Sequence, residues 1–316
     1  MKTTHQTMKT QKSTIMKKTK VILATIVALL AFGAAAKAQF VQTYFNFGTY
    51  GTVAGGGTIV DQTGNTTATV NNDANTSLTS SGLAIASASG NSASTGVTLA
   101  SGSLSGFTGN FSIQDWVTIG NPNNGVVLWG ANNGPANTWI GDGYTGFSTL
   151  IGFSWGSLAG GGGTGNPLGQ PYNRYGNSIG GVSLAAGQTY DMVLTYDAST
   201  YTFNQYINGT WTSSLQEAFS STSLAGAQIF AIGGCPNEPW SGWGDASADA
   251  TTKDFLIYNG ALSAGQVSAL DAAGAGASLD AINVVVPEPG SLALMALAGV
   301  IGLCFRRSIR SSMTAS

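Results

Sequence analysis

Short runs in which apolar and polar side chains alternate recur along the middle of the chain. Side chains point alternately to the two faces of a β-strand, so this period of two predicts strands with one buried face. The clearest run is residues 190–196, YDMVLTY, which has an aromatic or apolar residue at every second position. The strands expected from such runs are residues 42–47, 66–70, 82–86, 96–99, 111–119, 126–129, 148–155, 190–196, 201–207, 229–232 and 254–258.

Turn and cap residues separate these runs. Asn208-Gly209 predicts a tight hairpin, because both residues adopt positive φ at little cost. After the last strand, Ser263 and Gln266 have the spacing of a capping box and predict a short helix. Residues 274–285 are then expected to form a linker.

The composition allows either a disordered matrix protein or an all-β domain, since the chain has 45 Gly and only 8% charged residues. The aromatic residues favour the second interpretation. All seven Trp lie between residues 116 and 243, whereas disordered chains lack such side chains. We therefore expect an all-β fold, a β-sandwich of two antiparallel sheets that occupies residues 39–273 as one domain.

The N-terminal segment has the three parts of a secretory signal peptide: lysines, an apolar run at residues 21–36 and a small-residue cleavage site. The cleavage-site residues are Ala36, Ala38 and Gln39, with the cut before Gln39. Residues 1–38 are thus expected to be the signal peptide, with Met16 as an alternative start. An uncleaved N-terminal anchor is the competing interpretation.

The C-terminal segment predicts a transmembrane helix at about residues 290–305, which carry no charge and are followed by Arg306 and Arg307. Sixteen residues form a helix of about 24 Å, somewhat short of a bilayer core of about 30 Å. A buried helix of a globular fold is the alternative, but it would show polar positions at helical spacing. Arginines stay on the cytoplasmic side, so the upstream body is expected outside.

Between the two terminal segments the chain is strongly acidic. Residues 39–286 contain thirteen Asp and Glu against Arg174 and Lys253, a formal charge of −11. Nucleic-acid binding depends on clustered basic residues that neutralise phosphates. The composition therefore excludes a nucleic-acid partner for the body.

The order of features in the tail resembles the PEP-CTERM sorting signal of Gram-negative bacteria. The residues that carry the resemblance are Val286, Pro287, Glu288 and Pro289, then the apolar segment, then Arg306 and Arg307. The resemblance covers residues 286–310 and implies retention at the inner membrane. It also implies that an exosortase-type protease cuts near Pro-Glu-Pro and releases the protein to the cell surface or an extracellular matrix.

The body resembles the LamG-like, or concanavalin A-like, jelly roll. The matching pieces are the turn at residues 61–65, then FSIQDWV, YDMVLTYD and YINGTW, and finally DFLIYNGALSAGQVSAL at residues 254–270. The resemblance implies a possible structural Ca²⁺ held by Asp61 and Asp254. This sequence departs from the family in Gln266, where Glu is common, and in a Gly-rich insertion at residues 156–181.

Catalytic residues are scarce in this sequence. Its only histidine is His5, so the body holds neither a Ser–His–Asp triad nor a His-ligated zinc site. A glycosidase needs two carboxylates about 5–9.5 Å apart. The body's only glutamates, Glu217 and Glu238, are 21 residues apart and lie on no alternating carboxylate strand. We therefore expect a protein that is not an enzyme.

One loop combines paired tryptophans with polar side chains and is the candidate glycan-binding site. Tryptophan faces stack on the C–H surfaces of sugars, while amides and carboxylates bind hydroxyls. The candidate residues are Trp240, Trp243, Asn237, Glu238 and Asp245; the alternative is a loop that only covers the sandwich edge. The expected function is therefore glycan binding or adhesion, with polysaccharide as partner. A purely structural matrix protein is the alternative, and an exported glycan hydrolase comes third.

Overall fold

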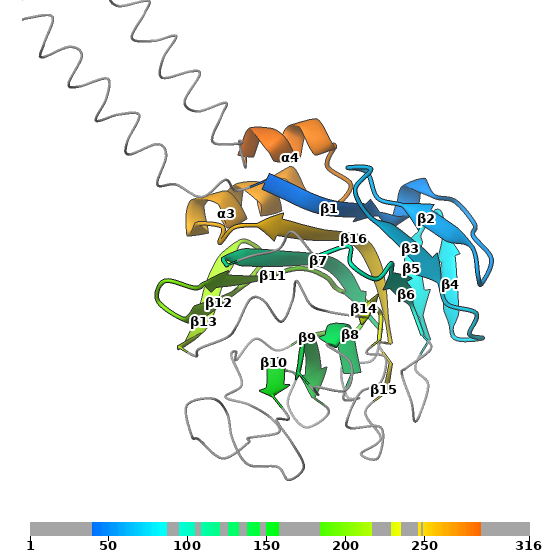
Figure 1. Cartoon of the computed structure of the whole chain (residues 1–316), viewed down its shortest axis with the longest axis horizontal. Coiled ribbons are helices and arrows are strands. Elements are labelled where there is room, and N and C mark those ends of the chain that lie inside the picture. The colour runs from blue at the N-terminus through cyan, green and yellow to red at the C-terminus, as the bar shows by residue number, and fades with distance from the viewer. Residues whose placement is uncertain are drawn as a thin grey trace, which may run out of the picture. The chain divides into compact units, whose positions relative to one another are not determined.

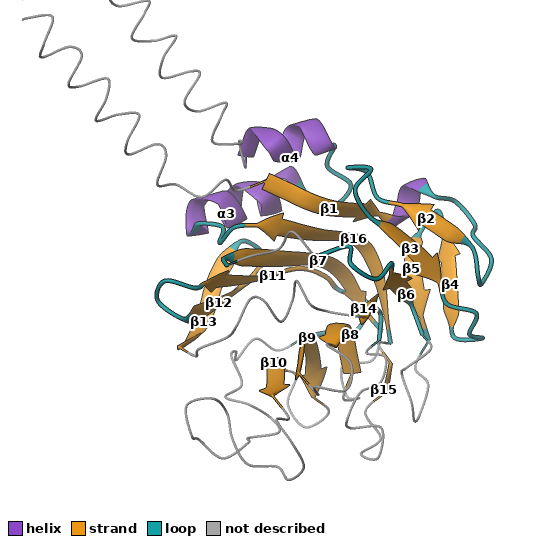
Figure 2. Cartoon of the chain, in the orientation of Figure 1, coloured by secondary structure: helices purple, strands orange, loops and turns teal. Residues whose placement is uncertain are grey.

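The computed structural model describes the fold of the body. It covers residues 40–86, 95–104, 109–120, 126–132, 138–145, 150–157, 184–216, 229–234, 246–247 and 249–285. Within these ranges the chain forms mostly β-strands in two antiparallel sheets (Figures 1 and 2). The all-β prediction is confirmed.

The first sheet has the strand order β13–β12–β11–β7–β16–β5–β4, and β1 also pairs with β16. Its strands are β1 (Phe40–Asn46), β4 (Thr76–Thr79), β5 (Gly82–Ile85), β7 (Phe111–Ile119), β11 (Thr189–Asp197), β12 (Thr202–Ile207), β13 (Thr210–Gln216) and β16 (Ala250–Asn259). Strands far apart in sequence thus become neighbours, since β7 lies between β11 and β16.

The second sheet has the order β10–β9–β8–β14–β6–β3–β2, with β15 paired in parallel to β8. Its strands are β2 (Thr58–Val60), β3 (Thr67–Val70), β6 (Val97–Leu99), β8 (Val126–Asn132), β9 (Thr138–Thr145), β10 (Leu150–Ser157), β14 (Ile229–Ile232) and β15 (Ala246–Ser247). The 3₁₀ helix η1 (Phe47–Thr49) and the helices α3 (Ala264–Ala273) and α4 (Leu279–Val285) complete the described elements.

The inner core joins the two sheets. Phe111, Tyr196 and Phe203 of the first sheet belong to the same buried cluster as Trp129 and Phe230 of the second. Rings stack closely there, with Tyr196 and Phe203 centroids 4.4 Å apart. Such aromatic pairs add to the free energy gained by burial alone. The aromatic residues therefore do form a core, as the composition predicts.

An outer core covers the opposite face of the first sheet. Val193 and Leu256 alternate with inner-facing neighbours and pack instead with Val267, Leu270 and Ile282 of the two helices. Figure 2 shows α3 and α4 on this side of the sheet, beside β1 and β16. The first sheet is therefore buried on both faces.

Several local predictions are confirmed. Asn208 and Gly209 both have positive φ, 49° and 69°, in the hairpin between β12 and β13. Ser263 caps α3 and forms the predicted capping box with Gln266. Sequence patterns missed β2, β4, β9, β13 and β15; β9 contains two glycines and an aspartate, which have low β-propensity.

The segment 274–285 differs from the linker that we expected. It contains α4, and Ile282 is only 3% exposed in the outer core. Leu279 and Val285 are partly buried in the same cluster, three residues to either side of Ile282. This helical spacing of apolar residues explains why the segment packs on the body instead of extending away from it.

The signal-peptide residues and the tail fall outside the described ranges. Within those ranges, no helix has the length and apolar character needed to cross a membrane.

Candidate functional site

Most residues predicted for function lie outside the part of the chain that the structure describes. They are the glycan-binding candidates Trp240, Trp243, Asn237, Glu238 and Asp245, the sorting residues Val286, Pro287, Glu288, Pro289, Arg306 and Arg307, and the cleavage-site residues Ala36, Ala38 and Gln39. These roles therefore stay predictions. The two calcium candidates, Asp61 and Asp254, are described.

Asp61 holds the turn after β2 against β1. Its carboxylate accepts hydrogen bonds from the backbone N–H of Tyr44 (3.0 Å), Thr63 (3.2 Å) and Thr66 (2.8 Å), and from the Thr63 hydroxyl. The side chain is 4% exposed. These donors satisfy the hydrogen-bonding capacity that burial would otherwise leave without water. Asp61 thus connects the backbone of β1 to the backbone of the turn after β2.

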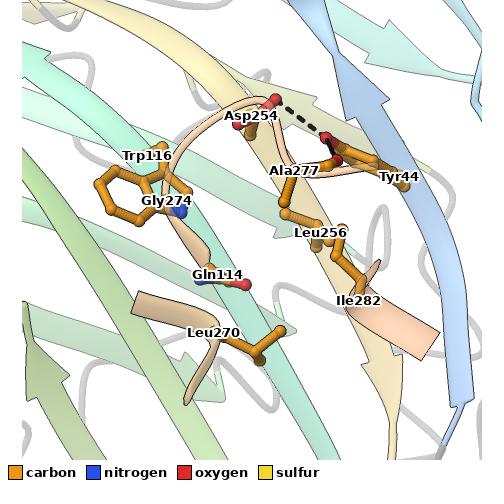
Figure 3. A pocket seen from close by; sticks show the side chains of 9 residues that line it. All are labelled: Tyr44, Gln114, Trp116, Asp254, Leu256, Leu270, Gly274, Ala277 and Ile282. Carbon is orange, nitrogen blue, oxygen red and sulfur yellow. Dashed lines mark hydrogen bonds between the residues drawn. The ribbon is translucent and has the colours of Figure 1, made fainter. Parts of the chain in front are cut away.

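Asp254 ties the loop between α3 and α4 to the sheet (Figure 3). It accepts a hydrogen bond from the Gly276 N–H, and the Tyr44 hydroxyl lies 3.4 Å from its Oδ1 and 2.7 Å from the Ala277 carbonyl oxygen. Burial raises the pKa of the Asp254 carboxyl, while the Gly276 N–H and the Tyr44 hydroxyl lower it. A cavity of about 10 Å³ lies beside these groups, room for roughly one water.

The two predicted calcium ligands contact different parts of Tyr44. Asp61 contacts the backbone of Tyr44, whereas Asp254 contacts its hydroxyl. Oδ2 of Asp61 accepts three donors, which leaves it no free lone pair for a cation. Among the described residues, no three His, Cys, Asp or Glu side chains are grouped so that they could hold a metal ion. Oδ1 of Asp61 accepts the Thr66 N–H and keeps a second lone pair. Calcium binding by Asp61 and Asp254 therefore stays a prediction.

Next to Asp254, four chain segments enclose an open cavity of about 410 Å³. Its lining residues are Asn46, Gly48, Ser80, Ser81, Lys253, Asp254, Ala275 and Gly276. These come from the end of β1, from η1, from the β4–β5 turn, from β16 and from the α3–α4 loop. We call this cavity the Lys253 hollow. Pattern analysis of the sequence did not predict it, because its walls are distant in the chain.

A second buried carboxylate lies on the outer face of the first sheet. Asp191 Oδ1 accepts a hydrogen bond from Gln114 Nε2 at 2.9 Å, and Gln114 Oε1 accepts one from the Tyr258 hydroxyl at 2.6 Å. Oδ2 of Asp191 has no hydrogen-bond partner in the structure. The pKa of Asp191 is raised to about 7 in total: burial raises it most, the Gln114 hydrogen bond lowers it, and the nearby charges of Asp271 and Asp254 raise it.

Asp115 and Asp191 lie on opposite faces of the first sheet. Asp115 is directly opposite Met192 and Phe255, which belong to the inner core, and side chains of directly paired residues share a face. Asp191 is opposite Trp116 on the outer face. A glycosidase needs both carboxyl groups on one cleft. These two buried carboxylates therefore do not form a catalytic pair.

The two antiparallel sheets and their closing strand and helix define a β-sandwich of the lectin and glucanase kind. Residues 89–268, more than half of the chain, match the family model Laminin_G_3, described as the concanavalin A-like lectin/glucanases superfamily. The chain belongs to this superfamily. Residues 285–308 match the model of the PEP-CTERM protein-sorting motif, so the resemblance in the tail is confirmed.

Solved structures of similar fold include carbohydrate-active proteins. Domain 4 of AbnA, an extracellular arabinanase from Geobacillus stearothermophilus in complex with arabinotriose, is 18% identical with a TM-score of 0.46, over 74% of this chain and 100% of that domain. A Trypanosoma rangeli sialidase is 17% identical with a TM-score of 0.46, over 75% of this chain and 32% of the sialidase. The chain thus spans about a third of the sialidase. None of the curated proteins compared with the chain matches it.

We expect Asp61→Asn to lower the free energy of unfolding by roughly 1–3 kcal/mol, because the amide places a donor against backbone N–H groups. Chemical denaturation of the body, residues 39–286, measures this loss. The loss should be the same in Ca²⁺ and in EGTA. A wild-type Tm that rises with Ca²⁺, and does so no longer in Asp61→Asn, would instead support Asp61 as a calcium ligand.

We expect the stability of the body to fall as pH rises from about 4 to about 7. In this window an unfolded Asp191 ionises at its ordinary pKa of 3.8, while the folded carboxyl, with its pKa near 7, stays protonated. Below the window both states are protonated, and above it both are ionised, so the loss is then complete. Asp254 and Asp271, whose pKa values burial also raises, contribute in the same direction.

Asp191→Asn should make the free energy of unfolding less dependent on pH over this range. Urea denaturation at a series of pH values measures this. Asp197→Asn is the matched control on the same strand, because that residue is only partly buried and its bonds to Ser199 lower the pKa of its carboxyl. The control should keep the decline. An unchanged slope in Asp191→Asn would show that Asp191 does not titrate in this range.

Proposed function

We propose that the protein is an exported bacterial surface or extracellular-matrix protein whose sandwich binds glycans without catalysis. A cleaved signal peptide, residues 1–38, directs export, and the apolar segment at about 290–305 holds the chain at the inner membrane. An exosortase-type protease then processes the tail at the sorting motif. The released body contributes adhesion or polysaccharide binding to the cell surface or matrix.

The observation that carries this proposal is the presence of two matches in one chain. The body matches the lectin and glucanase superfamily, and the tail matches a protein-sorting motif. A sorting tail supports a destination outside the cytoplasm, and many domains of this sandwich type act on or bind carbohydrates. The two together favour a glycan-binding role at the cell exterior.

The chemistry of the body supports binding over catalysis. Its sequence contains no histidine, the usual proton shuttle at neutral pH. Asp61 and Asp254 are engaged with donors of the fold, and Asp115 and Asp191 face opposite sides of the first sheet. These carboxylates serve the structure in their described positions and support no hydrolytic pair.

The tryptophan-containing loop is the proposed glycan contact. In the sequence it lies between β14 and β15, and both of these strands pair with β8. The second sheet therefore holds the chain on either side of the loop. Loops anchored in this way are common positions for binding residues. Trp240 and Trp243 would stack on sugar rings, with Asn237, Glu238 and Asp245 as hydroxyl partners.

We expect the body, residues 39–286, to bind at least one glycan class on an array. Trp240→Ala and Trp243→Ala should each weaken that binding by about tenfold, since truncating a tryptophan at the centre of a binding surface commonly costs more than about 1 kcal/mol and tenfold is about 1.4 kcal/mol. Trp211→Ala is the matched control, because Trp211 is 54% exposed on β13, outside the loop. No binding on a broad array would favour the structural-matrix alternative. Release of reducing sugar would favour a hydrolase.

We expect the mature protein to begin at Gln39 and to end near Pro287–Pro289 in cells that contain an exosortase-type protease. Mass spectrometry of both termini, together with cell fractionation, measures this. Replacing Pro287, Glu288 and Pro289 with alanine should leave the tail attached and the protein in the membrane fraction. Lys253→Gln, a change in the body, is the control and should be processed normally. An intact chain in the cytosol would contradict export and sorting together.

A further inference from the structure

The Lys253 hollow brings four separate chain segments to one rim of the first sheet. Ser80 and Ser81 form the turn of the β4–β5 hairpin, and Asn46 ends β1 opposite Asp254 of β16. These elements meet near the middle of β16, where its pairing passes from β5 at Thr252 to β1 at Asp254. Figure 1 shows β1 and β5 beside β16. At about 410 Å³ the hollow falls within the range of about 300–1,000 Å³ typical of small-molecule pockets.

A β-bulge places the charge in this hollow. The pairing of β16 with β7 shifts register between Thr252 and Asp254, so Lys253 is the extra residue. A bulge re-aims side chains, and bulges are common beside binding sites. Here it leaves Lys253 exposed at the hollow while Asp254 stays buried in the sheet.

Lys253 is the only basic residue among those that the structure describes, in a body of formal charge −11. Asp254 lines the same hollow and interacts electrostatically with Lys253, while its oxygens also accept hydrogen bonds from the Gly276 N–H and the Tyr44 hydroxyl. The exposed Lys253 ammonium remains within reach of a ligand in the hollow. It is the one positive charge that the described residues offer to an anion on an otherwise acidic body.

The remaining walls are small and polar. Gly48, Ala275 and Gly276 have little or no side chain, and a Cβ on Gly48 would come within 3.3 Å of the Ser80 carbonyl oxygen. Gly276 has φ of +76°, a conformation that favours glycine. Hydroxyl and amide groups of Ser80, Ser81 and Asn46 thus line a space that larger residues would fill. These groups suit the hydroxyls of a sugar ring.

We propose that the Lys253 hollow binds the carboxylated sugar unit of an acidic oligosaccharide. The Lys253 ammonium contacts the carboxylate, and Ser80, Ser81 and Asn46 contact the ring hydroxyls. The inference rests on the proposed glycan-binding function and adds a charge preference and a second site, separate from the tryptophan loop. Because the hollow has no aromatic wall, its binding depends on polar contacts and weakens with salt.

The test uses trigalacturonate and its methyl-esterified form, which share ring stereochemistry and differ in charge. Short oligomers suit this test, because the acidic body repels a long polyanion. Titration calorimetry or chemical-shift mapping at low ionic strength compares the two ligands on residues 39–286. Wild type should bind the acid about two- to fivefold more tightly than the ester, the gain expected from one exposed ion pair.

Lys253→Gln should abolish this preference, and Lys253→Arg should retain it. Gln216→Glu is the matched control: it changes the net charge by the same amount on β13, away from the hollow, and should leave the preference intact. Equal Tm values for these variants would show that the fold is unchanged.

Two outcomes would overturn the inference: wild type without a preference for the acid, or Lys253→Gln with the preference unaltered. The array measurement separates these results from failure of the proposed function. If neutral glycans bind and depend on Trp240 and Trp243 while charge has no effect, only the present inference fails. If no glycan of either kind binds, both fail.

Discussion

Burial of the first sheet on both faces is the constraint on which the rest of the structure depends. Its inner face packs on the second sheet, and its outer face packs under α3 and α4. Polar groups on a doubly buried sheet must find partners, because an unpaired one is costly. Gln114 therefore bridges Tyr258 and Asp191, and Tyr44 bridges Asp254 and the α3–α4 loop. The contacts of Tyr44 with Asp254 and the α3–α4 loop also position one wall of the Lys253 hollow.

Local patterns in the sequence predicted much of this fold. Alternation identified the long strands β7, β11 and β16, since each has enough residues to show a period of two. The hairpin at Asn208 and the cap at Ser263 were predictable because their chemistry lies within a few residues. Short strands such as β15, which has two residues, carry no detectable period. Such short strands form because they pair with strands that are distant in the sequence, as β15 pairs with β8.

The candidate sites were less predictable, for a related reason. In the sequence, Asp191 is a polar residue at an alternate position of β11. Only the packing of α3 and α4 on the outer face shows that it is buried. Likewise Lys253 is an ordinary surface lysine in the sequence, and its surroundings come from residues that are near in space and distant in the chain. Asp61 was predicted as a calcium ligand; nothing in the sequence indicated the backbone donors whose hydrogen bonds its carboxylate accepts, and its role toward calcium stays a prediction.

The short helix α4 ends at Val285, the residue at which the match to the sorting motif begins. No spacer separates the last packed residue of the body from the tail. Severing the chain at Pro287 or beyond would therefore remove nothing that completes the outer core. The protein would have the same folded body before and after cleavage of the tail. Cleavage would therefore change the location of the protein and leave its binding surfaces unchanged.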